Sequence, residues 1–113
     1  MHKKSFNKPD EIRNPSVNTK VEVIKIADVE LHHATFQPGW KWSVDVKPSA
    51  GTEYCQVHHL LYGISGRLNT VMADGTEIEM GPNDVLDIPP GHDGSVVGNE
   101  PFVCIDLGGA IRS

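Results

Sequence analysis

The spacing of turn signals is the feature that most constrains the fold of this chain. From Val21 onward, turn-forming residues recur about every 8–15 residues, and no window carries an apolar repeat of 3.6 residues. The runs between the turns are short and rich in β-branched residues, and about nine or ten of them can be distinguished. This pattern predicts an all-β fold, an antiparallel sandwich or barrel with no substantial helix.

Two stretches show the pattern most clearly. In RLNTVMADGTEIEM (67–80), Asp74-Gly75 supplies the positive φ values of a tight turn between two extended arms. In WKWSVDVK (40–47), apolar and polar residues alternate strictly, which is the period of a half-buried strand. We therefore expect a hairpin over the first stretch and a strand over the second.

The length of 113 residues suits one domain with one core. Residues 1–20 are polar and contain two prolines, so we expect an N-terminal arm in which at most PDEIR (9–13) forms a helical turn. Residues 21–113 are expected to form a single β-barrel domain.

Charge, hydropathy and motifs exclude several classes of function. The formal net charge of −5 argues against nucleic acid as a partner. No apolar run reaches 18 residues and no signal-like segment follows Met1, so we expect no membrane partner and a cytoplasmic location. There Cys55 and Cys104 stay free thiols, with a bridge between them as the lesser alternative. The motifs of serine hydrolases, NTPases, dehydrogenases and helical His-Glu-x-x-His metalloproteases do not occur.

A cluster of metal-ligating residue types lies within GTEYCQVHHLLYGISG (51–66). Glu53, Cys55 and His59 stand at odd positions, so an unbroken strand directs all three to one face, and His58 away from it. Side chains two apart on a strand can converge on one ion, and all three types bind zinc. His92 lies on a stiff Pro-Pro-Gly loop and can supply a fourth ligand. Taken singly, the same residues suit a buried thiol, a core histidine and a solvated carboxylate.

The chain resembles the small single-domain cupins, jelly-roll β-barrels with two motifs, G-x5-H-x-H-x3-E-x6-G and G-x5-P-x-G-x2-H-x3-N. NDVLDIPPGHDG (83–94) resembles the second motif, with Asn83 in the glycine position, a residue that tolerates the left-handed conformation. Its usual histidine falls at Gly94, two residues after His92. Read backwards from Gly66, the first motif has His59 where the family has Glu, and Cys55 and Glu53 where it has two histidines.

A closer resemblance concerns short cupins that also occur fused to adenylate or guanylate cyclases. PGWKWS, AGTEYCQVHH, SGRL, PPGHD and NEP are similar to this subgroup, in which acid-x-Cys-x3-His replaces His-x-His-x3-Glu. The resemblance implies a changed ligand set for a divalent metal rather than a lost one. The thiolate favours zinc, with Fe(II) or another transition metal as alternatives.

Three functions remain open at this stage. The first is a small-molecule-binding or regulatory module with one divalent metal in the barrel mouth, held by Glu53, Cys55, His59 and His92. The second is a metal-dependent enzyme, a dioxygenase, isomerase or lyase acting on a small organic acid, sugar or thiol. The third is a structural protein with an empty barrel, which Gly94 supports. Four protein ligands close a zinc site, whereas three leave a position for water or substrate.

Further residues carry secondary predictions. Asp87 and Asp106 lie in apolar strands, where solvent-facing positions are favoured over inward ones beside the metal. Arg67 is expected in a surface ion pair. Trp40 and Trp42 are expected in core or dimer packing rather than as a stacking platform for a ligand. We expect a homodimer, because small cupins commonly pair through sheet faces.

Overall fold

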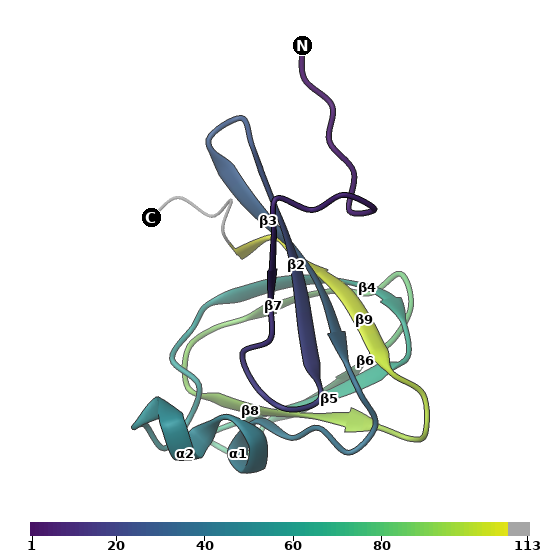
Figure 1. The fold of residues 1–113 in the computed structure, drawn as a ribbon. Helices are drawn as coiled ribbons and strands as arrows, with labels where there is room; N and C mark the ends of the chain where they lie inside the picture. The colour runs from purple at the N-terminus through teal and green to yellow at the C-terminus, as the bar shows by residue number, and fades with distance from the viewer. Residues whose placement is uncertain (109–113) are drawn as a thin grey trace.

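A computed structural model of the protein describes residues 1–108 and shows an all-β fold, as the turn spacing predicts (Figure 1). The nine strands in this part of the chain are β1 (Glu11–Arg13), β2 (Thr19–Ile26), β3 (Val29–Phe36), β4 (His59–Ser65), β5 (Arg67–Met72), β6 (Glu77–Met80), β7 (Val85–Ile88), β8 (His92–Val97) and β9 (Phe102–Asp106). The helices there are two single turns, α1 (Trp42–Asp45) and α2 (Lys47–Ala50). None of the described helices is long and apolar enough to cross a membrane.

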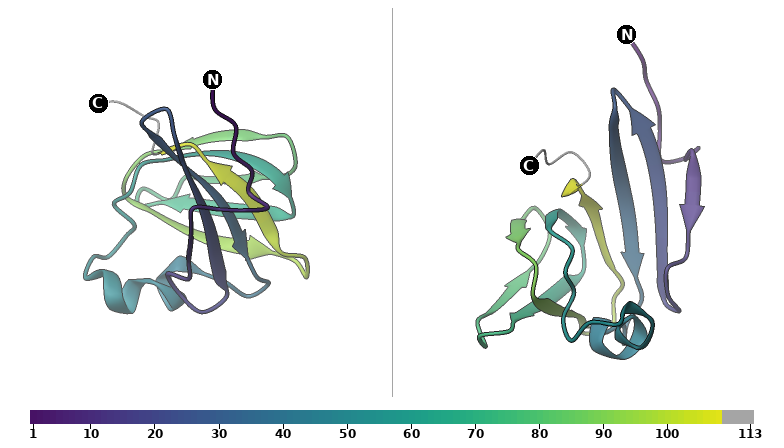
Figure 2. Two further views of the ribbon diagram at one scale, coloured as in Figure 1. Left: turned by 45° about the horizontal axis from the view of Figure 1, so that its top comes forward. Right: turned by 90° about the vertical axis from the view of Figure 1, so that its left-hand side faces the viewer.

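The strands form two antiparallel sheets that face each other as a jelly-roll barrel. One sheet has six strands in the order β1-β2-β3-β9-β4-β7, and the other has three in the order β6-β5-β8. The hairpin of β2 and β3 extends beyond the rest of the barrel, whereas α1 and α2 lie at the opposite end (Figure 2). This arrangement leaves an interior between the two sheets, where residues from both can meet.

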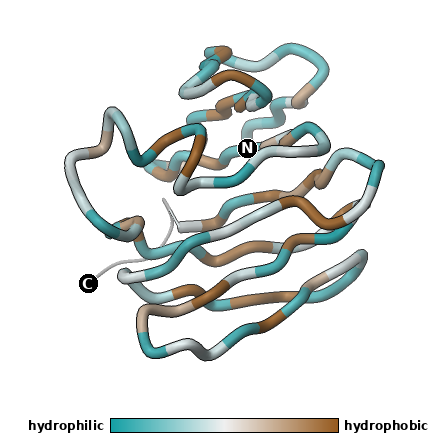
Figure 3. Tube along the Cα trace, turned by 90° about the horizontal axis from the view of Figure 1, so that it is seen from below, coloured by the Kyte–Doolittle hydropathy of each residue, from teal (hydrophilic) through white to brown (hydrophobic). Residues whose placement is uncertain are grey.

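Alternation along the strands decides which side chains enter that interior. On β9, Phe102 and Cys104 are fully buried, and Asp106 follows at the next position on the same face. The tube in Figure 3 shows the same interleaving of hydrophobic and hydrophilic residues along the strands. The period-2 pattern therefore places one acid, Asp106, on the inner face of a strand whose other inward residues are apolar.

Turn geometry agrees with the sequence in three places. The hairpin of β5 and β6 pairs Leu68 with Met80 and turns at Asp74-Gly75. Asn83 has a φ of 69°, so it takes the left-handed conformation expected of the glycine position that it occupies. Gly66 has a φ of 76°, and a Cβ atom there would collide with the carbonyl group of Pro101.

The strand predicted over residues 40–47 is wrong, because the chain forms α1 and α2 there. Two carboxylates accept hydrogen bonds from backbone amides at the start of α1. Asp45 Oδ2 accepts from Lys41 N at 2.8 Å, and Asp93 Oδ1 accepts from Ser43 N at 3.0 Å. The alternation nevertheless marks the right residues as core, since Trp40 and Trp42 are buried. Core packing of these tryptophans is thus confirmed.

The N-terminal segment departs from the prediction of a helical turn in residues 9–13. Glu11–Arg13 is strand β1, which pairs antiparallel with β2 at the sheet edge, and Asp10 Oδ2 accepts from Lys25 N at 2.8 Å. Strand β2 begins at Thr19, just before the predicted domain boundary. Residues 109–113 of the predicted domain lie outside the described residues.

Candidate metal centre

Backbone hydrogen bonds hold Cys55 against the start of β8. The Cys55 amide donates to the His92 carbonyl at 2.8 Å, and the Gly91 amide donates to the Cys55 carbonyl at 2.7 Å. This isolated bridge joins the segment before β4 to the segment that follows Pro89 and Pro90. Two candidate ligands from distant parts of the sequence are therefore fixed by the main chain itself.

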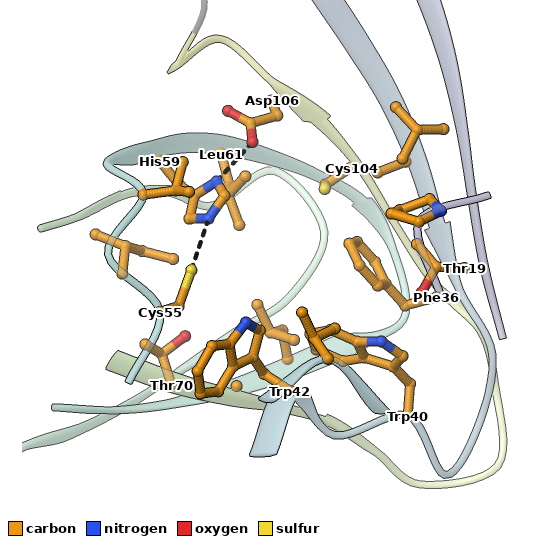
Figure 4. A pocket seen from close by; sticks show the side chains of 18 of the residues that line it. Thr19, Phe36, Trp40, Trp42, Cys55, His59, Leu61, Thr70, Cys104 and Asp106 are labelled. Carbon is orange, nitrogen blue, oxygen red and sulfur yellow. Dashed lines mark hydrogen bonds and ion pairs between the residues drawn. The ribbon is translucent and has the colours of Figure 1, made fainter. Parts of the chain in front are cut away.

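Three of the four predicted ligands meet in the interior. The donor atoms of Cys55, His59 and His92 lie within 4.8 Å of one another, and Cys55 Sγ is 3.7 Å from His59 Nε2. The rings of His59 and His92 meet edge to face with centroids 5.2 Å apart. Figure 4 shows the sulfur of Cys55 facing the imidazole of His59 inside the barrel. Such a spacing lets one ion contact all three donors.

Hydrogen bonds on the far side of each ring fix the tautomers of both histidines. His59 Nδ1 donates to Asp106 Oδ2 at 2.7 Å, and His92 Nδ1 donates to the Pro89 carbonyl at 2.8 Å. A carbonyl oxygen accepts only, so the Nδ1 atom of His92 carries a proton and its Nε2 atom faces the cluster. Metal-binding histidines usually have such a partner on the second nitrogen. Both imidazoles thus direct Nε2 toward the cluster, where a bound ion would replace the proton that His59 Nε2 shares with the Cys55 sulfur.

Electrostatics within the cluster favour the charged pair of Cys55 and His59. Burial opposes ionisation of the Cys55 thiol, but hydrogen bonds with His59 and His92 outweigh it and lower the pKa to about 6. Burial likewise disfavours a charged His59, but hydrogen bonds with Asp106 and Cys55 raise its pKa to about 9. Burial raises the pKa of Cys104, which remains a thiol. A thiolate, the form that binds metals, is therefore available at Cys55.

Glu53 does not join the other predicted ligands. Its side chain is 75% exposed and forms an ion pair with Lys47 at 2.9 Å, on the terminus of α2. The argument that placed it with Cys55 assumed an unbroken strand from residue 53 to 59. The strand β4 begins only at His59, residues 52–54 are bends, and residues 56–58 are not in a strand. The period-2 rule therefore does not reach Glu53, and the structure brings together three of the four predicted ligands.

His92 is the first residue of β8 rather than part of a loop, and it points inward like Gly94 two residues later. The sequence resemblance places the usual fourth histidine at Gly94. A Cβ atom built there would lie 3.7 Å from the Trp40 ring, and about 3.9 Å from atoms of Leu68 and Asn69. A side chain at 94 would therefore lie in van der Waals contact with Trp40, while His92 supplies an imidazole one inward position earlier.

Asp106 belongs to the candidate site although we expected it to face solvent. Its side chain is 17% exposed, and the His59 hydrogen bond holds the pKa of its carboxyl below the usual range despite its burial. The expectation was right for Asp87, which is exposed and pairs with His58. Arg67 also forms the predicted surface ion pair, with Glu79. The signal that could have found Asp106 is its even spacing from Phe102 and Cys104.

The cluster opens onto a cavity of about 300 Å³ between the two sheets. Cys55 and His59 lie at one side in Figure 4, Phe36 and Trp40 at the other, and Trp42 lies between them. Residues of both sheets contribute to a wall that is mostly apolar: Val21, Ala34, Phe36, Trp40, Trp42, Leu61, Leu68 and Ile88. A metal held by the three donors would therefore face a partly open, mostly apolar cavity of the size that small ligands occupy.

Comparison with solved structures identifies proteins with the same fold. A protein of unknown function from Rhizobium leguminosarum bv. viciae 3841 superimposes with a TM-score of 0.65, covering 94% of this chain and 93% of its own, at 18% identity. KdgF from Halomonas sp. superimposes with a TM-score of 0.58, covering 85% of this chain and 82% of its own, at 16% identity. The fold is cupin-like.

A third cupin-like neighbour is larger. The oxalate decarboxylase of Lactobacillus farciminis, solved as a formate complex, gives a TM-score of 0.60 and 17% identity over 91% of this chain, which spans 32% of that enzyme. No family model and no curated protein match the chain. At these identities the neighbours establish the cupin-like fold, and the chemistry has to be argued from the site itself.

Proposed function

We propose that this cupin-like barrel binds one divalent metal through Cys55 Sγ, His59 Nε2 and His92 Nε2, and uses it to bind a small molecule in the cavity. The observation that carries the proposal is the convergence of the three donor atoms within 4.8 Å. The hydrogen bonds to Asp106 and Pro89 support it, because they occupy Nδ1 of each ring and direct both Nε2 atoms toward the cluster.

The donor set favours zinc. One thiolate and two neutral imidazoles are borderline-soft ligands that zinc accepts in tetrahedral sites. Fe(II) and other transition metals remain the alternatives, although iron oxygenase sites ordinarily use a carboxylate where this site has sulfur. The lowered pKa of Cys55 supports a metal that prefers thiolate at neutral pH.

Three protein donors distinguish ligand binding from a purely structural role. A structural zinc ion usually has four protein ligands, whereas three leave a position for water or another molecule. With Glu53 paired to Lys47, the described residues of the cluster supply three, and they line the cavity. The resemblance to short cupins fused to cyclases supports a regulatory module as the biological role, in the cytoplasm.

The second candidate function is a metal-dependent enzyme, and the cavity beside the donors favours it. A bound ion would supply Lewis-acid chemistry there. Asp106 would hold His59 in position, and the apolar wall would exclude water from a reacting molecule. Turnover of a small organic acid, sugar or thiol by metal-loaded protein, and its loss in His59→Ala, would favour this reading over binding alone.

The direct test is metal analysis of the purified protein after growth with added zinc or iron. We expect close to one equivalent, and a strong thiolate-to-metal charge-transfer band when Co(II) replaces the native ion. Cys55→Ser should abolish that band, whereas the control Cys104→Ser should retain it, since Cys104 is not in the cluster. Less than about a tenth of an equivalent of any transition metal would contradict the proposal.

We also propose a homodimer. Trp40 and Trp42 are buried and cannot supply the contact, but Tyr62, Ile64 and Val85 are exposed, and Tyr62 and Val85 pair across β4 and β7. Sedimentation at high micromolar concentration should give twice the monomer mass. A monomer under those conditions would contradict the proposal.

A further inference from the structure

The cavity wall lacks the groups that bind highly charged or highly hydroxylated molecules. No lysine or arginine lies among the described residues that line it. Phosphates and dicarboxylates in proteins are commonly held by such cations, often through bidentate arginine contacts. Sugars require many hydrogen-bond partners, whereas most of this wall is apolar. These classes of ligand are therefore disfavoured by the chemistry of the lining.

The charges at the metal centre give the same indication. With a divalent ion bound, a Cys55 thiolate ligand and the Asp106 carboxylate behind His59 would together offset its two charges. The site then has no surplus positive charge with which to hold a dianion inside a low-dielectric cavity. A neutral or singly charged ligand fits this balance.

Thr70 provides an independent sign that the cavity receives a polar group. Its side chain lies on β5, it is 5% exposed, and its Oγ1 atom has no hydrogen-bond partner among the described residues. Buried hydroxyl groups are nearly always partnered, because desolvation without a hydrogen bond is unfavourable. Thr70 lines the cavity, below Cys55 in the view of Figure 4. A bound molecule can supply the missing partner.

Aromatic rings form the side of the cavity away from the histidines. Phe36 and Trp40 pack with ring centroids 4.6 Å apart, and Trp42 lines the space between them and Cys55 (Figure 4). Flat apolar groups pack well against such rings. The cavity thus has a metal-binding side and an aromatic side, with the Thr70 hydroxyl on its wall.

We infer that the ligand is a small, largely apolar molecule, neutral or singly charged, with one metal-binding group. Its apolar body packs against Trp40 and Trp42, and its polar group accepts a hydrogen bond from Thr70 Oγ1. This inference rests on the proposed metal centre, and it narrows the ligand of that site to one chemical class. Small aromatic acids, phenols and thiols belong to the class, whereas sugar phosphates and polycarboxylates do not.

The experiment uses Co(II)-loaded protein and a matched set of probes. Benzohydroxamate has a metal-binding group and an aromatic body, acetohydroxamate has the same metal-binding group without the ring, and malonate is a compact dianion. Changes in the cobalt spectrum report contact with the metal. Tryptophan fluorescence reports filling of the cavity, because both tryptophans of the chain line it.

We expect benzohydroxamate to bind roughly tenfold or more tightly than acetohydroxamate, because its ring is removed from water. It should change both signals, and malonate should change neither at comparable concentration. Equal affinities for the two hydroxamates, or preferential binding of malonate, would overturn this inference and leave the metal centre intact. Failure of cobalt to bind would overturn the proposed function, and this inference with it.

A pair of valine variants tests the role of Thr70. Thr70→Val should weaken benzohydroxamate binding by about fivefold without changing cobalt uptake, because it removes the hydroxyl and keeps the shape. The control is Thr35→Val, which makes the same change at a position of β3 that does not line the cavity. Unchanged affinity in Thr70→Val, or an equal loss in both variants, would overturn the assignment of Thr70 as a ligand contact.

Discussion

His58 and His59 are neighbours in the chain, and each is bound to an aspartate, yet the two pairs differ in their surroundings. The side chains of His59 and Asp106 are 26% and 17% exposed, whereas those of His58 and Asp87 are 43% and 67% exposed. Only His59 has a thiol beside its second ring nitrogen. The comparison teaches that a histidine–carboxylate pair marks a candidate site only when it is enclosed and holds the ring toward a third group.

The largest expected effect separates the two histidines by metal binding. His59→Ala should lower zinc affinity roughly a hundredfold or more, because it removes a ligand, a larger change than the loss of an outer hydrogen bond. His58→Ala should leave the affinity unchanged, since His58 is not in the cluster. Competition with a chromophoric chelator measures both. Equal losses in the two variants would break the comparison.

The second-largest expected effect is a difference in zinc affinity between variants of the two aspartates, Asp106 and Asp87. Asp106→Asn should lower zinc affinity by about 10- to 100-fold, because an amide anchors the Nδ1 proton of His59 more weakly than a carboxylate does. Asp87→Asn makes the same chemical change beside His58 and should have no effect. The same chelator titration applies, with circular dichroism to show that both variants are folded. Zinc affinity unaltered by Asp106→Asn would remove Asp106 from the site.

The reactivity of Cys55 in metal-free protein should sharpen the contrast further. Thiolate, the reactive form, increases as pH rises through the pKa, so alkylation by iodoacetamide should reach half its maximal rate near pH 6. In His59→Ala this midpoint should rise toward 9.0, the ordinary pKa of a cysteine thiol, whereas in His58→Ala it should remain near pH 6. Peptide mapping by mass spectrometry separates Cys55 from the buried Cys104. A midpoint near 9 in the wild type would contradict the charged pair.

The smallest expected effect concerns the exposed pair. A double-mutant cycle on His58 and Asp87 should give a coupling free energy well under about 1 kcal/mol, because solvent screens the interaction. Urea unfolding of the four proteins measures it. A coupling of several kcal/mol would mean that exposure does not distinguish the two pairs, and the comparison would lose its basis.

The fold could be predicted from the sequence largely because turn residues and alternation are local signals. Gly75 and Asn83 take the positive φ values expected of them, and the chain turns at Asp74-Gly75 as predicted although Asp74 itself has no positive φ. The strand prediction for residues 40–47 failed because the alternation of apolar and polar residues carries no information about hydrogen bonding. The carboxylates of Asp45 and Asp93 accept from the backbone at the start of α1. Asp93 is distant in sequence, so no window around α1 contains that information.

The site could be predicted only in part for a similar reason. Cys55, His59 and His92 were identified from their types and the motif they resemble, and the fold brings them together. Glu53 was included by extending a strand that begins only at His59. Asp106 was misjudged because its partner depends on the pairing of β9 with β4, where Leu61 lies opposite Asp106. Strand register of this kind is tertiary information.

The contact between Trp40 and Gly94 has an evolutionary consequence. A Cβ atom at position 94 would already be in van der Waals contact with the Trp40 ring, so an imidazole restored there would lie against the neighbouring indole. Lineages with the shifted histidine should therefore keep a small residue at 94 together with a bulky ring at 40. Searches that demand the standard spacing would miss such barrels, although their Cys-His-His cluster would still be present.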